Sequence, residues 1–138
     1  MAKSAPFSIR LSKATDDLIT REAKRTHRSK GAVLESLAQE ALSTRRFPGI
    51  AFRGSDWSRR PWVIGTALDV WEIVRAYREF GSPGEMAADT DLTEQQVRLA
   101  LAYYKENPEE IDDAIKDADR PLEDLRREFP GIDTIANH

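Results

Sequence analysis

One short segment near the start of the chain restricts the possible folds more than any other feature. Residues 7–12, Phe7-Ser8-Ile9-Arg10-Leu11-Ser12, alternate strictly between apolar and polar side chains, which predicts a β-strand with one buried face. The residues that follow have helical periodicity, so this strand has no partner within its own unit. Because strand N–H and C=O groups must pair, the simplest solution is an antiparallel ribbon formed with a second copy of the chain. The sequence therefore predicts a homodimer.

Two helices are expected directly after this strand. Ser12 can cap a helix that runs to about His27, and the turn at residues 28–31 then breaks it. A second helix is expected from about residues 29–31 to Thr44. Its apolar stripe has helical spacing and consists of Val33, Leu34, Leu37, Ala38, Ala41 and Leu42. Two copies would thus share a four-helix core beneath the ribbon.

This order of one strand and two helices resembles the ribbon-helix-helix family of repressors, over roughly residues 6–45. The resemblance implies that the ribbon enters the major groove of DNA, where Ser8, Arg10 and Ser12 read base edges and Arg10 has bidentate reach to guanine. It also implies that the start of the second helix, Ser29-Lys30-Gly31, binds a phosphate, with Arg28 adding positive charge. An amphipathic strand and helix pair without a DNA role is the alternative.

Charge is distributed unevenly along the chain. Residues 1–60 hold 13 Lys and Arg against 6 Asp and Glu, whereas residues 61–138 hold 8 against 18. A basic first half and an acidic second half indicate two different partners, although two ordinary solvated surfaces would give the same distribution.

The middle of the chain has the pattern of a small hairpin followed by helices. Short β-like segments at 50–52 and 62–64 enclose a polar stretch in which Arg59 and Arg60 are candidate phosphate contacts. Helices are expected at about 69–80, 83–89 and 93–105, the middle one short, as in a helix-turn-helix core. Ser82, Thr93 and Asn107 each precede a typical helix start, with Glu85 and Gln96 placed to complete the first two caps.

Several blocks of this middle region are similar to the family known as domain of unknown function 433, over roughly residues 47–113. The blocks are 47–50 (FPGI), 63–66 (VIGT), 81–86 (GSPGEM) and 92–104 (LTEQQVRLALAYY). The family often has arginine after its Gly-Thr pair, whereas this chain has Ala67. The resemblance implies an antitoxin, commonly encoded beside a PIN-like ribonuclease toxin. Since the third helix offers only Arg98 and Lys105 in acidic surroundings, a dimer or scaffold role is favoured for this module over a DNA role.

The last part of the chain is acidic and carries a thin apolar stripe. Pro121 opens a helical segment that has too little apolar surface to bury itself well. Either the segment packs back on its own module or it lies in a groove of a partner, and its acidity favours the basic RNA-binding surface of a ribonuclease. The candidate toxin-binding residues are Leu122, Leu125, Arg126, Arg127 and Phe129.

Catalysis is not expected from this sequence. It contains no cysteine and only two histidines, and no nucleophile, histidine and acid can be combined, nor is there a Gly-rich phosphate loop. We therefore expect no cofactor and no metal. The chain opens without an apolar signal core, and no segment approaches the roughly 18–20 apolar residues of a membrane helix, so a cytoplasmic protein is expected.

Together these patterns predict a mainly α protein with three parts. Residues 1–46 would be a ribbon-helix-helix domain for dimerisation and operator binding, 47–118 a hairpin and helix-turn-helix-like antitoxin module, and 119–138 a toxin-binding tail. The corresponding function is the antitoxin of a type II toxin–antitoxin system that represses its own operon, as a homodimer or in a larger complex with the toxin. The alternatives are a stand-alone ribbon-helix-helix regulator and a protein-interaction adaptor without a DNA role.

Overall fold

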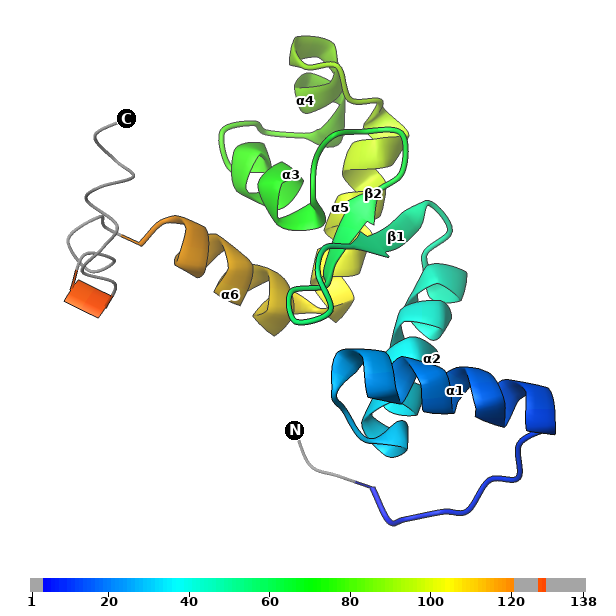
Figure 1. Ribbon diagram of the computed structural model, residues 1–138. Coiled ribbons are helices and arrows are strands. Elements are labelled where there is room, and N and C mark those ends of the chain that lie inside the picture. Colours follow the sequence, from blue (N-terminus) through cyan, green and yellow to red (C-terminus); the bar gives the residue numbers. More distant parts are fainter. Residues whose placement is uncertain (1–3, 121–126, 129–138) are drawn as a thin grey trace. The chain divides into compact units, whose positions relative to one another are not determined.

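The chain folds into two compact units, Met1–Arg46 and Phe47–His138, in a computed structural model that describes residues 4–120 and 127–128. Within these described residues the protein is mainly helical, with six helices and one two-stranded antiparallel sheet (Figure 1). The part of the chain that the structure describes has no helix with both the length and the apolar character needed to cross a membrane.

The N-terminal unit consists of two helices, α1 (Lys13–Thr26) and α2 (Lys30–Arg46). Ser12 is the N-cap of α1, and its hydroxyl accepts a hydrogen bond from the Thr15 N–H at 3.2 Å. His27 ends the helix in the left-handed region with φ of 54°, a conformation in which a non-glycine residue is uncommon. Both predicted helices are therefore confirmed, and α2 extends two residues beyond the predicted end at Thr44.

The predicted ribbon is not shown by the single chain. Residues 4–12 form neither strand nor helix, and both strands of the structure come after α2. The physical reason is that the predicted strand needs a partner strand from a second copy. A β-strand is defined by hydrogen bonds to a neighbouring strand, and residues 4–12 have no such neighbour within the described chain.

The C-terminal unit begins with a hairpin of β1 (Ile50–Arg53) and β2 (Arg60–Val63). The strands are antiparallel, with Ile50 opposite Val63 at one end and Arg53 opposite Arg60 at the other. The connecting loop needs Gly54, whose φ is +113°, because a Cβ there would lie 2.2 Å from the Ser58 carbonyl oxygen. The expected hairpin is confirmed, with β1 one residue longer than predicted and β2 starting two residues and ending one residue earlier.

Four helices follow the hairpin: α3 (Val70–Tyr77), α4 (Pro83–Asp89), α5 (Glu94–Glu106) and α6 (Pro108–Ala118). Thr93 and Gln96 form the predicted capping box of α5, with bonds of 2.9 and 3.1 Å. Glu85 differs from the prediction, because its carboxylate accepts the Gly81 N–H rather than that of Ser82. The side chain of Asn107 also differs, since it donates to the Tyr103 carbonyl instead of capping α6.

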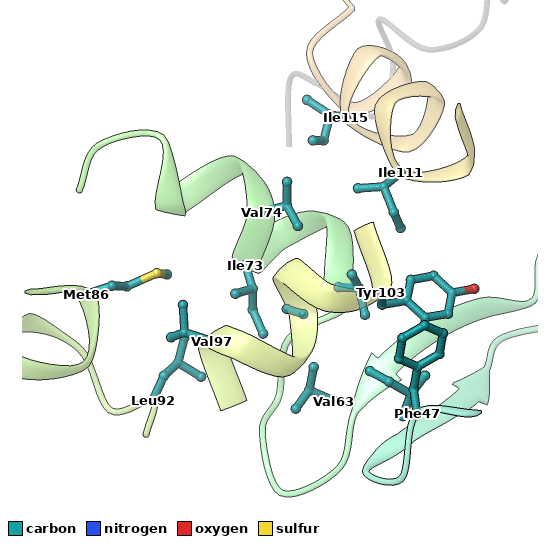
Figure 2. Packing of buried hydrophobic residues seen from close by; sticks show 13 residues of the cluster. Phe47, Val63, Ile73, Val74, Met86, Leu92, Val97, Tyr103, Ile111 and Ile115 are labelled. Carbon is teal, nitrogen blue, oxygen red and sulfur yellow. The ribbon is translucent and has the colours of Figure 1, made fainter. Parts of the chain in front are cut away.

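The core of the C-terminal unit forms around α5. Figure 2 shows Val97 and Tyr103 of α5 surrounded by side chains from the hairpin, from α3 and α4 and from α6. The phenyl ring of Phe47 meets the Tyr103 ring edge to face, with 5.2 Å between the ring centroids. The buried side chains are Phe47, Ile50, Val63, Val70, Ile73, Val74, Met86, Leu92, Val97, Ala100, Tyr103, Ile111 and Ile115.

Candidate nucleic-acid and dimer interface

The N-terminal unit leaves much of its apolar surface exposed. Among its described residues, 4–46, the buried apolar cluster contains only Ile19, Ala23 and Val33. By contrast, five large apolar side chains in the same range are exposed: Phe7 (83%), Ile9, Leu18, Leu37 and Leu42 (65%). A unit as short as Met1–Arg46 seldom folds on so small a core without a metal, a disulfide or a second subunit. The unpartnered apolar surface therefore has the composition of an interface.

An open groove of about 520 Å³ runs between the start of the unit and its two helices. Its apolar lining comes from Ile9 and Leu11 of the extended segment and from Ile19 and Leu34 of α1 and α2. Ile9 and Leu11 thus border the helices, although Ile9 is still 58% exposed, and Phe7 of the same predicted face is 83% exposed.

The three predicted base-reading residues occupy different environments in the single chain. Ser8, Arg10 and Ser12 are all exposed. Ser12 also caps α1, and its hydroxyl donates to the Thr15 hydroxyl at 3.0 Å. The Ser12 hydroxyl therefore serves the helix start, although the side chain is accessible.

The residues predicted to bind a phosphate lie together at the start of α2. The Ser29 hydroxyl accepts the Ala32 N–H at 3.1 Å, while Lys30 forms an ion pair with Asp16 of α1. A Cβ at Gly31 would meet nothing within 4 Å, so the backbone there is open to a ligand. Arg28 differs from the expectation of a free cation, because its guanidinium is half-buried and donates to the Thr26 and Ser36 hydroxyls.

The arginines of the hairpin have structural partners that the sequence did not reveal. Arg53 and Arg60 lie opposite each other and share the carboxylate of Asp69, which is 3% exposed. Without Asp69, two like charges would face each other across the strand pair. Arg59, predicted as a phosphate contact, donates to the carbonyls of Gly54 and Phe52 at 3.1 and 3.0 Å. Arg59 and Arg60 therefore also stabilise the hairpin.

Sequence reasoning missed Trp57 at the tip of this hairpin. Its side chain is 76% exposed, the most exposed large apolar side chain of the C-terminal unit's described residues. The signal in the sequence was a tryptophan inside the polar stretch between two short strands, where neither strand periodicity nor a helical stripe requires it.

The predicted toxin-binding residues are mostly beyond what the structure describes. Leu122, Leu125, Arg126 and Phe129 lie outside the described residues, and Arg127 is exposed. Arg120, just after α6, pairs with Glu128 at 2.8 Å.

Two tyrosine–carboxylate pairs join α5 to α6. The Tyr103 hydroxyl donates to Glu110 at 2.9 Å, and the Tyr104 hydroxyl donates to Asp112 at 2.7 Å. Burial raises the pKa of Glu110, although the hydrogen bond from Tyr103 acts in the opposite direction. Burial and the nearby Glu110 also raise the pKa of Tyr103. These acidic side chains therefore connect helices, and in the described residues no three potential metal ligands gather.

Glu110→Gln is expected to stabilise the C-terminal unit slightly at neutral pH, by less than about 1 kcal/mol, and to lose this effect in acid. Because the pKa of Glu110 is raised, the folded state binds this proton more tightly than the unfolded chain does. The stabilisation from that proton is present below the pKa of Glu110 in the unfolded chain and is lost as pH rises through its pKa in the folded protein. A glutamine at this position accepts the hydrogen bond from Tyr103 without binding a proton. Urea unfolding between about pH 4 and pH 7 measures the difference, and a difference independent of pH would contradict this assignment.

No protein-family model, no curated protein and no solved structure matches this chain. The likeness to ribbon-helix-helix repressors and to domain of unknown function 433 therefore rests on the sequence blocks alone.

Proposed function

We propose that the chain is a dimeric DNA-binding regulator of ribbon-helix-helix type and the antitoxin of a toxin–antitoxin pair. The observation that carries the dimer is the exposed apolar surface of the N-terminal unit, whose described residues include three apolar residues in the buried cluster and five large apolar side chains that are exposed. Pairing of residues 7–12 with the same residues of a second copy would satisfy the unpaired backbone and cover Phe7 and Ile9 together.

The charge and exposure of the same unit support DNA as the ligand of this dimer. Arg10 is exposed on the segment whose apolar residues, Ile9 and Leu11, line the groove of the helices. Across an antiparallel ribbon, two such arginines would lie on one face and could reach guanine edges in the major groove. The open backbone at Gly31 and the adjacent Lys30 would contact a phosphate at each end.

Arg10→Ala is expected to weaken specific binding to the DNA upstream of the gene by about 1–3 kcal/mol per base contact. The measurement is a binding titration of the purified dimer across a salt series, in which log affinity should fall with a slope near −0.9 per phosphate contact. Arg45→Ala is the matched control, since it removes the same charge from an exposed position of the same unit. Equal losses for the two variants would mean that Arg10 contributes only charge and reads no base.

The antitoxin part of the proposal concerns the acidic second half of the chain. Residues 61–138 carry 18 acidic against 8 basic side chains, and this excess would complement the basic RNA-binding surface of a PIN-like ribonuclease. In this proposal the anchors are Leu122, Leu125, Arg126, Arg127 and Phe129, and the chain itself catalyses nothing.

Deleting residues 120–138 is expected to abolish toxin binding and to leave operator binding unchanged. Size-exclusion chromatography of the truncated protein with the ribonuclease encoded beside it measures the first property, and the DNA titration measures the second. A truncated protein that still holds the ribonuclease tightly would contradict the role of the tail. Operator binding without any ribonuclease partner would favour the stand-alone regulator instead.

A further inference from the structure

The sheet of the C-terminal unit has two strands within the described residues, so each strand has one edge that no strand covers (Figure 1). Such an edge presents backbone N–H and C=O groups that pair readily with a strand of another chain. In this hairpin one edge is closed by the backbone, and the other is closed by an arginine side chain.

The outer edge of β2 is closed by the chain itself. Pro61 has no N–H to offer to a further strand. The Val63 N–H donates to the Leu68 carbonyl, and Trp62 forms a bridge with Asp69. A strand could therefore add to β2 only by displacing the segment that follows it.

The outer edge of β1 presents the backbone groups of Phe52. In an antiparallel pair, successive residues turn these groups alternately toward the partner strand and away from it. The Ile64 N–H donates to the Gly49 carbonyl at 2.9 Å, which fixes the alternation along β1. Phe52 lies three positions after Gly49 and opposite Pro61, which could not donate to it. The N–H and C=O of Phe52 therefore point away from β2.

The Arg59 guanidinium covers this edge. Its Nη2 donates to the Phe52 carbonyl at 3.0 Å, and its Nη1 donates to the Gly54 carbonyl at 3.1 Å. A strand added to β1 would donate its own N–H to the Phe52 carbonyl and would have to take the place of Arg59. If that strand came from a second copy, it would also bring a second Arg59, and the two positive charges would repel each other.

We propose that Arg59 closes the β1 edge against β1 of a second copy and so prevents self-association of the C-terminal unit through its sheet. A second copy is the strand to be excluded, because every copy carries the same edge and identical edges can pair about a two-fold axis. This role concerns the C-terminal unit alone and goes beyond the proposed operator and toxin binding. If the N-terminal units dimerise as proposed, each dimer carries two such edges, and uncovered edges would link dimers into open chains.

The test is sedimentation of the full-length protein over a concentration series. Arg59→Ala is expected to reach at least about twice the weight-average mass of the wild type at high concentration and to return to the wild-type mass on dilution. Arg98→Ala is the matched control, because it removes the same charge from an exposed position of the same unit and should keep the wild-type mass. Arg59→Lys keeps the charge but not the two-pronged donor, so its mass should lie between those of Arg59→Ala and the wild type.

Amide hydrogen exchange shows where the copies meet. Because the Phe52 N–H points outward, its exchange in Arg59→Ala should slow at least about tenfold as the concentration rises, whereas in the wild type it should not depend on concentration.

Four outcomes would overturn the role of Arg59. The first is a wild-type mass for Arg59→Ala at every concentration, and the second is association without slower exchange at Phe52, which would place the contact elsewhere. The third is a wild-type mass for Arg59→Lys, which would leave charge repulsion as the whole effect. The fourth is loss of the circular dichroism of the folded protein in Arg59→Ala, which would mean that Arg59 holds the hairpin together and does not merely cover its edge.

Discussion

Asp69→Ala is expected to lower the free energy of unfolding of the C-terminal unit by about 3 kcal/mol. The carboxylate is 3% exposed and accepts from Arg53 at 2.8 Å and from Arg60, so its removal leaves two guanidinium groups facing each other across the hairpin. Asp69 is also the N-cap residue of α3, which means that one substitution disturbs both the hairpin and the helix behind it. Because both arginines are partly exposed and can regain water, the loss should lie at the lower end for a buried ion pair.

Urea unfolding followed by tryptophan fluorescence measures this effect in the C-terminal unit alone. All three tryptophans, Trp57, Trp62 and Trp71, lie in that unit, so the signal does not report on α1 and α2. Arg98→Ala is the control, since the Arg98–Glu94 pair has side chains 64% and 51% exposed and should contribute no more than about 0.5 kcal/mol. Similar losses for Asp69→Ala and Arg98→Ala would mean that the buried carboxylate does not organise the hairpin.

Ile73→Ala should destabilise the same unit by about 3–4 kcal/mol. Ile73 is 0% exposed in the middle of α3 and lies beside α5 in the centre of the core (Figure 2). Shortening it leaves a cavity that the helices on both sides cannot fill, because α3 and α5 are held by their own caps and by other buried side chains.

Ile64→Ala provides the matched control for this cavity. The chemical change is the same, but Ile64 is 50% exposed and leaves space that water fills, so the expected loss is below about 1 kcal/mol. The same fluorescence measurement compares the two variants. If both lost the same stability, the cluster around α5 would not be the close-packed core described above. Operator binding should persist in Ile73→Ala at temperatures where only the C-terminal unit unfolds, since the proposed ribbon belongs to the other unit.

Helix starts were the features most open to prediction from the sequence, because capping joins residues three positions apart. Ser12 caps α1 and Thr93 pairs with Gln96 as expected. The helix start at Ser82 was also predicted, but the Glu85 carboxylate accepts a hydrogen bond from the Gly81 N–H and not from the Ser82 N–H. Two backbone N–H groups lie within reach of that carboxylate, and the local pattern does not distinguish between them.

Helix ends and long-range ion pairs could not be predicted from the sequence, for a different reason. α3 ends at Tyr77 rather than at the predicted Phe80, since residues 78–80 make turn-like bonds that let Phe80 pack on the core. Arg60 was predicted as a phosphate contact, and what the sequence did not show is that the strand register places it opposite Arg53, with both guanidinium groups paired to Asp69. In this register Ile50 lies opposite Val63 and both belong to the buried core, which the residues around the arginines do not reveal.

The sequence by itself determined the mainly helical class, the break near residue 47, the positions of the helices and the hairpin, and the need of the first unit for more apolar contact than it can make alone. These follow from periodicity, capping and turn residues, which act over a few neighbouring positions. Only the tertiary structure decided that Asp69 neutralises the hairpin arginines, that Arg28 ties α1 to α2, and that Trp57 is exposed at an ordered tip. Asp69 reaches Arg53 and Arg60 across 16 and 9 positions of the chain, and Arg28 reaches Ser36 across 8, which is beyond the range of the local patterns.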